Sequence, residues 1–404
     1  METISVIFIF PVFLIALGTI YLVTRLIAIK APSHQYAALD GLRGFLALSV
    51  FLHHAPKWYY LTHFHRWVVA PSILYFNLGI VGVSFFFMIT ALLFFSKLME
   101  AAGGEMDWTK LYVSRVLRIM PLYLIAIISL FILVGILSHF TLREPSERIF
   151  IEWLKWLFFV HTDINAAPET GYVILAVQWS LAYEWFFYFT LPIIGYLFFK
   201  IKTPRLLILV TGLFLALFLF IILRYHSGRG VTQMSPFLGG IAAAFLVKNE
   251  KIRSVASSRV VVPVLLLSLF VVLYYCPVFF QVLPFLSIVA VFIALACGND
   301  LFGLLNLRVC RLLGQISYSI YLLHPFVLYI VFQYIIGFNT AGKLSLWAFW
   351  LVIAGCACAV TVVCSLTYYF IERPCLKMVN IVAKKIKSVA NYLPKEGAQK
   401  MHKG

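Results

Sequence analysis

The sequence predicts an all-α integral membrane protein, a polytopic helical bundle with about eleven transmembrane helices. Of its 404 residues, 63% are hydrophobic and 12% are charged, whereas a soluble domain carries about 25% charged residues. The mean hydropathy is +0.98, so lipid has to cover part of the surface. The apolar residues also fall into runs of roughly 20, the length of a membrane-crossing helix.

The apolar runs place the expected spans in order. The first, 4–29, is expected to be a retained helix and not a cleaved signal peptide, because its basic residues follow the apolar run. Residues 148–162 carry Glu152 and Lys155, which favours an interfacial helix. In the short span 234–247, Gly239 and Gly240 predict close helix packing. The other expected spans are 37–55, 73–96, 112–138, 176–199, 205–224, 260–276, 281–297, 315–337 and 345–370.

The basic residues predict the orientation and exclude one class of partner. Alternate crossing of these spans puts about 24 of the 32 Lys and Arg residues on one side, which is expected to be the cytoplasm. The C-terminal tail lies on that side. The net charge of +17 does not indicate a nucleic-acid partner, because the basic residues form short clusters between apolar runs.

The seven cysteines do not indicate a metal site. They show no CxxC pair and no histidine at metal-ligand spacing. Small packing residues in the core are the better interpretation, and no metal cofactor is predicted.

Ionisable residues inside the apolar runs are the informative ones, because placing them in lipid is costly. Arg43 and His54 lie on one predicted helix, about 16 Å apart along its axis at 1.5 Å per residue. This suits a reaction whose two substrates arrive from opposite sides. Alternatively, Arg43 reaches back to the membrane surface, and His53 and His54 mark an interface.

Two further groups carry acidic and basic side chains. Arg115 and Arg118 share a helix face, and paired guanidiniums are suited to phosphates, although an ordinary cytoplasmic cluster of basic residues has the same spacing. Glu184 follows Trp179, deep enough in its helix to require a partner, expected to be a His or Arg. A purely structural pair is the alternative.

The last group surrounds His324. Ser317, Tyr318 and Tyr321 form a polar stripe with it at helical spacing, and Pro325 frees a backbone carbonyl nearby. The stripe indicates a site, whereas a single His on an apolar helix can equally be a packing residue.

Taken together, these segments resemble the membrane-bound acyltransferase family 3 over residues 36–376. Each motif is weak alone, but six occur in the family's order. One departure is Thr90-Ala91, where the family often has Ser-Gly. The matching pieces are Leu39-Asp40-Gly41-Leu42-Arg43-Gly44 with His54, Gly79 with Gly82, Arg115 with Arg118, Trp179-Ser180-Leu181 with Glu184, Ser317 to Pro325, and Glu372 with Pro374.

The resemblance implies a core of about ten helices, an acyl-CoA donor and a glycan acceptor. Relatives transfer an acyl group, most often acetyl from acetyl-CoA, to hydroxyls of cell-surface or lipid-linked saccharides such as lipopolysaccharide. It also implies the bacterial inner membrane as the location. The chain would then consist of an additional N-terminal helix in 1–35, the acyltransferase membrane domain in 36–376 and a basic cytoplasmic tail in 377–404.

The family match and the residues together give a mechanistic hypothesis. Arg115 and Arg118, with Arg43, would bind the donor phosphates, and His54 would take the proton of the acceptor hydroxyl. Glu184 would orient a histidine. His324 and Tyr321 would stabilise the oxyanion or bind sugar, with Trp179 and Ser317 as further substrate contacts. His53 competes with His54 as the base, and an acyl-histidine intermediate competes with direct transfer.

A transporter or flippase of a lipid-linked saccharide is the alternative function. Such a protein would also be polytopic and carry buried ionisable groups. Transporters more often show inverted repeats with broken helices in matching positions, and no such symmetry is visible in the sequence.

Overall fold

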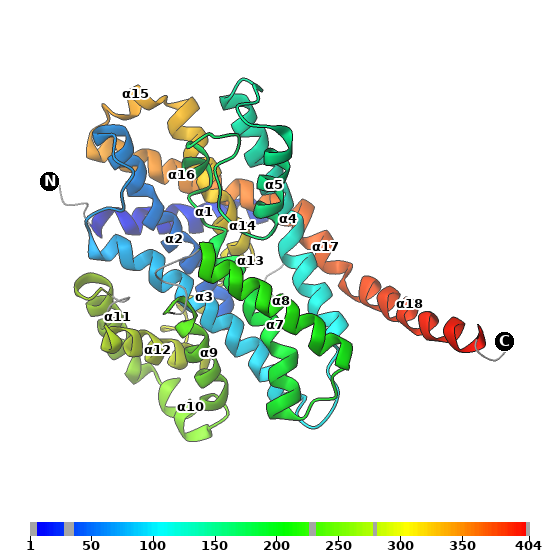
Figure 1. Cartoon of the computed structure of the whole chain (residues 1–404). Coiled ribbons are helices and arrows are strands. Elements are labelled where there is room, and N and C mark those ends of the chain that lie inside the picture. The colour runs from blue at the N-terminus through cyan, green and yellow to red at the C-terminus, as the bar shows by residue number, and fades with distance from the viewer. Residues whose placement is uncertain (1–5, 28–35, 226–231, 278–280, 401–404) are drawn as a thin grey trace.

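Helices make up the part of the chain that the computed structural model describes, residues 6–27, 36–225, 232–277 and 281–400 (Figure 1). Two isolated β-bridges are the only extended pairings there. Lys30 and the ends of the expected span 4–29 lie outside the described residues. The long helices are α1 (Ile9–Leu26), α2 (Ala37–Phe64), α3 (Ile73–Glu100), α4 (Trp108–Leu137), α7 (Trp179–Phe199), α8 (Arg205–Tyr225), α14 (Ser317–Ile330), α16 (Leu346–Thr367) and α18 (Val379–Lys400).

Shorter helices complete the bundle and its two ends. They are α5 (Ser146–Leu157), α6 (Thr170–Ile174), α9 (Ser235–Leu246), α10 (Glu250–Ala256), α11 (Val262–Tyr275), α12 (Val282–Ala296), α13 (Arg308–Gln315), α15 (Phe338–Ala341) and α17 (Arg373–Lys377). Two π-helical segments, η6 (Val331–Ile335) and η7 (Tyr368–Glu372), continue α14 and α16.

The described helices support the predicted polytopic membrane protein. Seven of them are long and apolar enough to cross a membrane, and an eighth is possible if Glu250–Ala256 and Arg259–Tyr275, bent by 56°, form one span. The expected number of eleven stays a prediction. The remaining expected spans fall on α9 and α12, with 12 and 15 residues, and on α2, whose apolar run is interrupted by polar residues such as Arg43 and Lys57.

Helix α2 lies in the interior, against α3, α13 and α14, and glycines allow this close packing. A Cβ on Gly41 would lie 2.0 Å from the Leu305 carbonyl oxygen, and one on Gly314 would lie 1.7 Å from the Asp40 carbonyl oxygen. The start of α2 therefore contacts the segment before α14 backbone to backbone, which accounts for the glycines around Arg43.

The predicted close packing at Gly239 and Gly240 is confirmed. A Cβ on Gly240 would lie 2.2 Å from the Met88 carbonyl oxygen, so α9 packs directly on α3. A proline inside α7 is also accommodated. Because Pro192 has no N–H, the Tyr188 carbonyl lacks its helical donor, and the Tyr112 hydroxyl donates to it at 3.1 Å.

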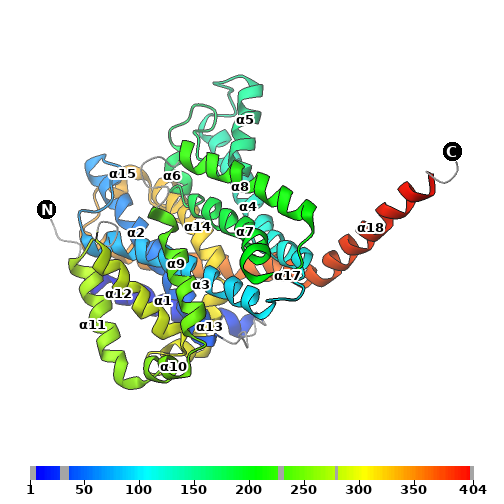
Figure 2. The ribbon, with the colours of Figure 1, turned by 60° about the horizontal axis from the view of Figure 1, so that its bottom comes forward.

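Two peripheral features complete the architecture. Helix α5 overlaps the segment 148–162 expected to be interfacial, but begins two residues earlier, and with 12 residues it is too short to cross a bilayer. Helix α18 extends away from the bundle, as both orientations show (Figures 1 and 2). Its first turns pack Val379 and Ala383 against Val113 of α4.

Candidate active site

Two cavities lie inside the helices that carry the predicted site residues. The arginine cavity, of about 100 Å³, is lined by Arg43, Arg115, Arg118, Glu184 and Ser317 together with aromatic and aliphatic side chains. The histidine cavity, of about 510 Å³, is lined by His53, His54, Lys57, Trp179 and Tyr183 among others. Val83, Phe87 and Tyr321 line both, so these three side chains separate one cavity from the other.

The same helices supply both cavities at different levels. Helix α2 provides Arg43 to one and His54 to the other, and α7 provides Glu184 and Trp179 in the same way. Every predicted site residue except His324 lines one of the two. His324 is fully buried and lies behind His54.

His54 and His324 are hydrogen-bonded to each other although 270 residues separate them. His54 Nδ1 lies 3.0 Å from His324 Nε2, and both side chains are buried. His324 Nδ1 lies 2.9 Å from the Ile320 carbonyl oxygen, which can only accept, so this nitrogen carries the proton. In a neutral His324, Nε2 then accepts, and His54 Nδ1 has to donate. His54 Nε2 is left with a free lone pair.

His53 points into the same cavity but has different neighbours. Its Nδ1 lies 2.8 Å from the Tyr75 carbonyl oxygen, and its ring centroid is 4.8 Å from that of His54. A Cβ on Gly79 would lie 2.6 Å from His53 Cγ. The glycine of the Gly79 and Gly82 motif therefore leaves room for this ring.

The predicted partner of Glu184 is wrong. Glu184 Oε1 accepts from the Thr90 hydroxyl at 3.2 Å and from the Tyr188 hydroxyl in a short hydrogen bond; no described His or Arg forms an ion pair with it. Since Glu184 lines the arginine cavity and His54 the histidine cavity, the carboxylate does not orient His54. Thr90 keeps the hydroxyl of the serine usual in the family, and that hydroxyl binds Glu184.

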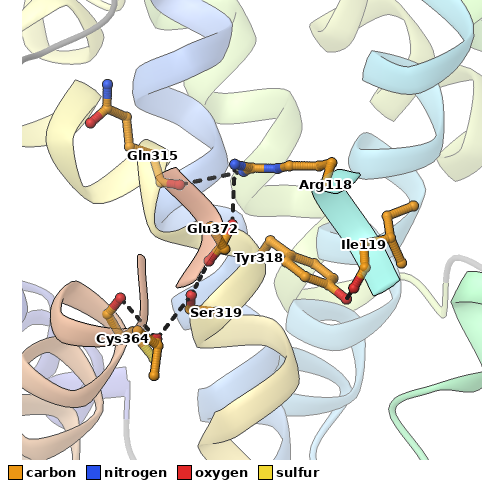
Figure 3. A network of polar contacts seen from close by, with 8 residues as sticks. Arg118, Ile119, Gln315, Tyr318, Ser319, Cys364 and Glu372 are labelled. Carbon is orange, nitrogen blue, oxygen red and sulfur yellow. Dashed lines mark hydrogen bonds and ion pairs between the residues drawn. The ribbon is translucent and has the colours of Figure 1, made fainter. Parts of the chain in front are cut away.

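The two arginines of α4 line the same cavity but are not equivalent. Arg118 forms an ion pair with Glu372 at 3.1 Å and donates to the Gln315 carbonyl at 3.4 Å. Ser319 in turn donates to Glu372, as Figure 3 shows. Arg115 lies over the Phe94 ring, 5.0 Å from its centroid, and enters no described ion pair.

Glu372 is a residue whose role the sequence did not reveal. It is 1% exposed, at the end of the π-helical segment η7. A π-helical turn inside an α-helix frequently marks a functional position. Glu372 was visible as part of a Glu-x-Pro motif, but its contact with Arg118, 254 positions earlier in the chain, was not.

Three smaller polar groups complete the cavities. Tyr321 donates to the Val177 carbonyl at 2.8 Å and contacts the Ser180 hydroxyl at 2.7 Å, so it is fixed at the boundary. The Ser317 hydroxyl and Arg43 Nε are buried without a hydrogen-bond partner among the described residues, and both residues line the arginine cavity.

The described residues contain no group of three His, Cys, Asp or Glu side chains arranged to hold a metal ion. All seven cysteines are free, and Cys297, Cys310, Cys356 and Cys364 are buried.

Comparison with known proteins agrees with the sequence resemblance. The acyltransferase domain of the acyltransferase 3 family matches residues 36–369. YrhL of Bacillus subtilis (strain 168), provisionally named a peptidoglycan O-acetyltransferase, is 26% identical over 381 residues, 85% of this chain and 56% of YrhL. The O-acetyltransferase OatA of Staphylococcus aureus (strain MRSA252) is 23% identical over 399 residues, 92% of this chain and 61% of OatA.

The chain thus spans 56% and 61% of the length of these two relatives. No solved structure matches it significantly. Because the family match covers most of the chain, including both cavities, the protein belongs to the membrane-bound acyltransferase family 3.

Proposed function

We propose that this protein transfers an acyl group, in the first instance acetyl, from acyl-CoA to a hydroxyl of a cell-surface or lipid-linked glycan. The thioester end of the donor occupies the arginine cavity and the acceptor the histidine cavity. The enzyme lies in the bacterial inner membrane with its C-terminal tail in the cytoplasm. Family membership and relatives that carry O-acetyltransferase names support this proposal.

One observation carries the proposal. A cavity lined by cations and a cavity lined by imidazoles meet at Val83, Phe87 and Tyr321. A donor that bears phosphates and an acceptor that bears a hydroxyl can therefore enter separately and react at this boundary. Holding two reactants next to each other in this way makes a bimolecular reaction effectively unimolecular, which accounts for much of an enzyme's rate acceleration.

The arginine cavity suits only the thioester end of the donor. At about 100 Å³ it is far smaller than the histidine cavity, so the nucleotide remains outside it. Arg43 and Arg115 are the cations available to the negative charge that develops on the thioester oxygen, because Arg118 is paired with Glu372. The hydroxyl of Ser317 and the Nε–H of Arg43, which have no described partner, are the donors available to the thioester.

On the acceptor side, His54 acts as the general base. Its free Nε2 takes the proton of the acceptor hydroxyl while the hydroxyl oxygen attacks the thioester carbonyl carbon. The C–O bond forms, the C–S bond breaks, and the thiolate leaving group recovers the proton from His54. His324 is a positioning residue, because its Nε2 accepts from His54 Nδ1 and thereby keeps the base in the reactive tautomer. Trp179 offers an aromatic face to the sugar.

The test compares glycans from cells that carry the wild-type protein, His54→Ala or His53→Gln. We expect His54→Ala to lose the acyl increment per repeat in mass spectrometry, corresponding to a rate loss of about 10²–10⁴-fold for a missing general base. Protein abundance in the membrane is the control. Equal loss from His53→Gln would reassign the base, and lost export or shortened chains with intact acylation would favour a transporter.

A further inference from the structure

Among the described side chains that line the histidine cavity, Lys57 is the one charged residue. It lies three residues after His54 and four after His53 on α2, so its side chain neighbours each of the two histidines on the helix surface, and all three line the cavity. The rise between His54 and Lys57 is about 4.5 Å. In the sequence, Lys57 is a single lysine followed by aromatic residues, and that pattern does not predict a functional residue.

Among the described residues, no carboxylate balances this ammonium group. No Asp or Glu lines the histidine cavity, and none of the ion pairs among the described residues involves Lys57. In the part of the chain that the structure describes, its ammonium group makes a cation–π contact with Trp67, whose ring centroid lies 5.9 Å from Nζ. The arginine cavity differs, because Glu184 lines it and Glu372 neutralises Arg118.

The surroundings of Lys57 raise the cost of leaving it unpaired. The side chain is only partly exposed, and the cavity wall near it is largely apolar and aromatic, with Phe76, Tyr183 and Tyr225. Taking a charge partly out of water is unfavourable unless an opposite charge compensates. The aromatic faces suit a sugar ring, and the ammonium suits an anionic oxygen.

We propose that the acceptor is an anionic glycan, whose carboxylate or phosphate group binds Lys57 while the hydroxyl to be acylated lies at His54. This inference rests on the proposed function and names its substrate class. Both side chains line the histidine cavity, and the rise of about 4.5 Å between the two residues along α2 is short enough for one sugar residue to contact both. A carboxylate of an acidic sugar and a diphosphate that links a sugar to its lipid carrier share this chemistry.

The test uses full-length protein in proteoliposomes with acetyl-CoA and two pairs of acceptors. One pair is a disaccharide containing glucuronic acid and its methyl ester. The other is N-acetylglucosamine linked to undecaprenyl diphosphate and free N-acetylglucosamine. We expect wild-type kcat/KM to favour the anionic member of at least one pair by about tenfold or more, the scale of a charge-assisted hydrogen bond. The pair that shows the preference identifies the source of the anion.

Three variants complete the experiment. Lys57→Met should abolish the preference, and Lys57→Arg should keep most of it. Lys343→Met is the matched control, because Lys343 is an exposed lysine that does not line the cavity, and it should keep the wild-type preference. A wild-type protein that acylates both members of both pairs equally would overturn the proposal even if Lys57→Met did not accumulate. A preference that survives in Lys57→Met would overturn it as well.

Failure of the underlying function looks different. In that case no acceptor is acylated in a His54-dependent manner, whatever its charge.

Discussion

The contact between His54 and His324 makes a sharp prediction, because two substitutions of His324 separate its two hydrogen bonds. A glutamine places its amide near the position of Nε2 and keeps an acceptor for His54 Nδ1–H. An asparagine reaches only the position of Nδ1, where it can still donate to the Ile320 carbonyl, but it leaves His54 Nδ1–H without its acceptor. Both substitutions replace the same buried imidazole by a primary amide, so the two variants differ mainly in how far that amide reaches.

The expected difference follows from the burial of the pair. A buried donor that loses its partner costs about 1–3 kcal/mol, and each 1.4 kcal/mol corresponds to about tenfold. If this cost falls on the reactive tautomer of His54, His324→Asn should be about five- to 150-fold less active than His324→Gln. His324→Gln should itself fall below wild type, since its amide replaces the bond to His54 but not the imidazole's second hydrogen bond, to the Ile320 carbonyl.

The assay is acetyl transfer by purified protein in proteoliposomes, with unfolding in detergent as the stability control. Equal activity of His324→Gln and His324→Asn at equal stability would refute the tautomer argument. So would a ¹⁵N spectrum of wild-type protein in which the proton of neutral His54 resides on Nε2.

Three further predictions concern the scaffold. Glu372→Gln breaks a buried ion pair and should lower the free energy of unfolding by about 3–5 kcal/mol, measured by denaturant titration in detergent; an unchanged midpoint would contradict it. Gly314→Ala should destabilise by about 1–3 kcal/mol or more, because its Cβ would meet a carbonyl oxygen at 1.7 Å, whereas Gly212→Ala, with nothing within 4 Å, should be neutral or stabilising; equal effects would refute this. Burial of Asp107 alone would raise its pKa, but Lys387, 2.7 Å away, and the Lys110 amide outweigh burial and keep that pKa below its usual value. The contribution of this pair to docking of α18 is therefore present at neutral pH and should be lost as the pH falls below about 4. The measurement is the distance between spin labels on α18 and α4, which should lengthen at low pH in the wild type. In Asp107→Asn this distance should not change with pH.

Much of the candidate site was predictable because ionisable residues are rare in apolar helices. Arg43, Arg115 and Glu184 drew attention for that reason, and all of them line one cavity. The glycine pair Gly239-Gly240 was informative for a similar reason: at Gly240 the backbone of Met88 comes so close that no side chain fits. The number of spans was less predictable, because α2 is buried inside the bundle and does not need a uniformly apolar surface.

The pairing of polar groups across helices was not predictable. The sequence suggested a His or Arg partner for Glu184, but hydroxyls of Thr90 and Tyr188 bind it. The sequence predicts that Arg118 binds phosphate together with Arg115, whereas in the structure it forms an ion pair with Glu372. Membrane helices are apolar around most of their circumference, so periodicity does not show which face meets which neighbour.

The sequence by itself determined that this chain is a membrane protein of the acyltransferase 3 family, since composition, apolar runs and the order of short motifs are properties of the linear chain. Only the tertiary structure decided that His54 lies against His324 and that Val83, Phe87 and Tyr321 separate two cavities. It also decided that Lys57 lines one of these cavities with no Asp or Glu among the described residues around it. These features depend on side chains that meet across helices far apart in sequence. Such contacts are fixed by the packing of the whole bundle and by no local pattern.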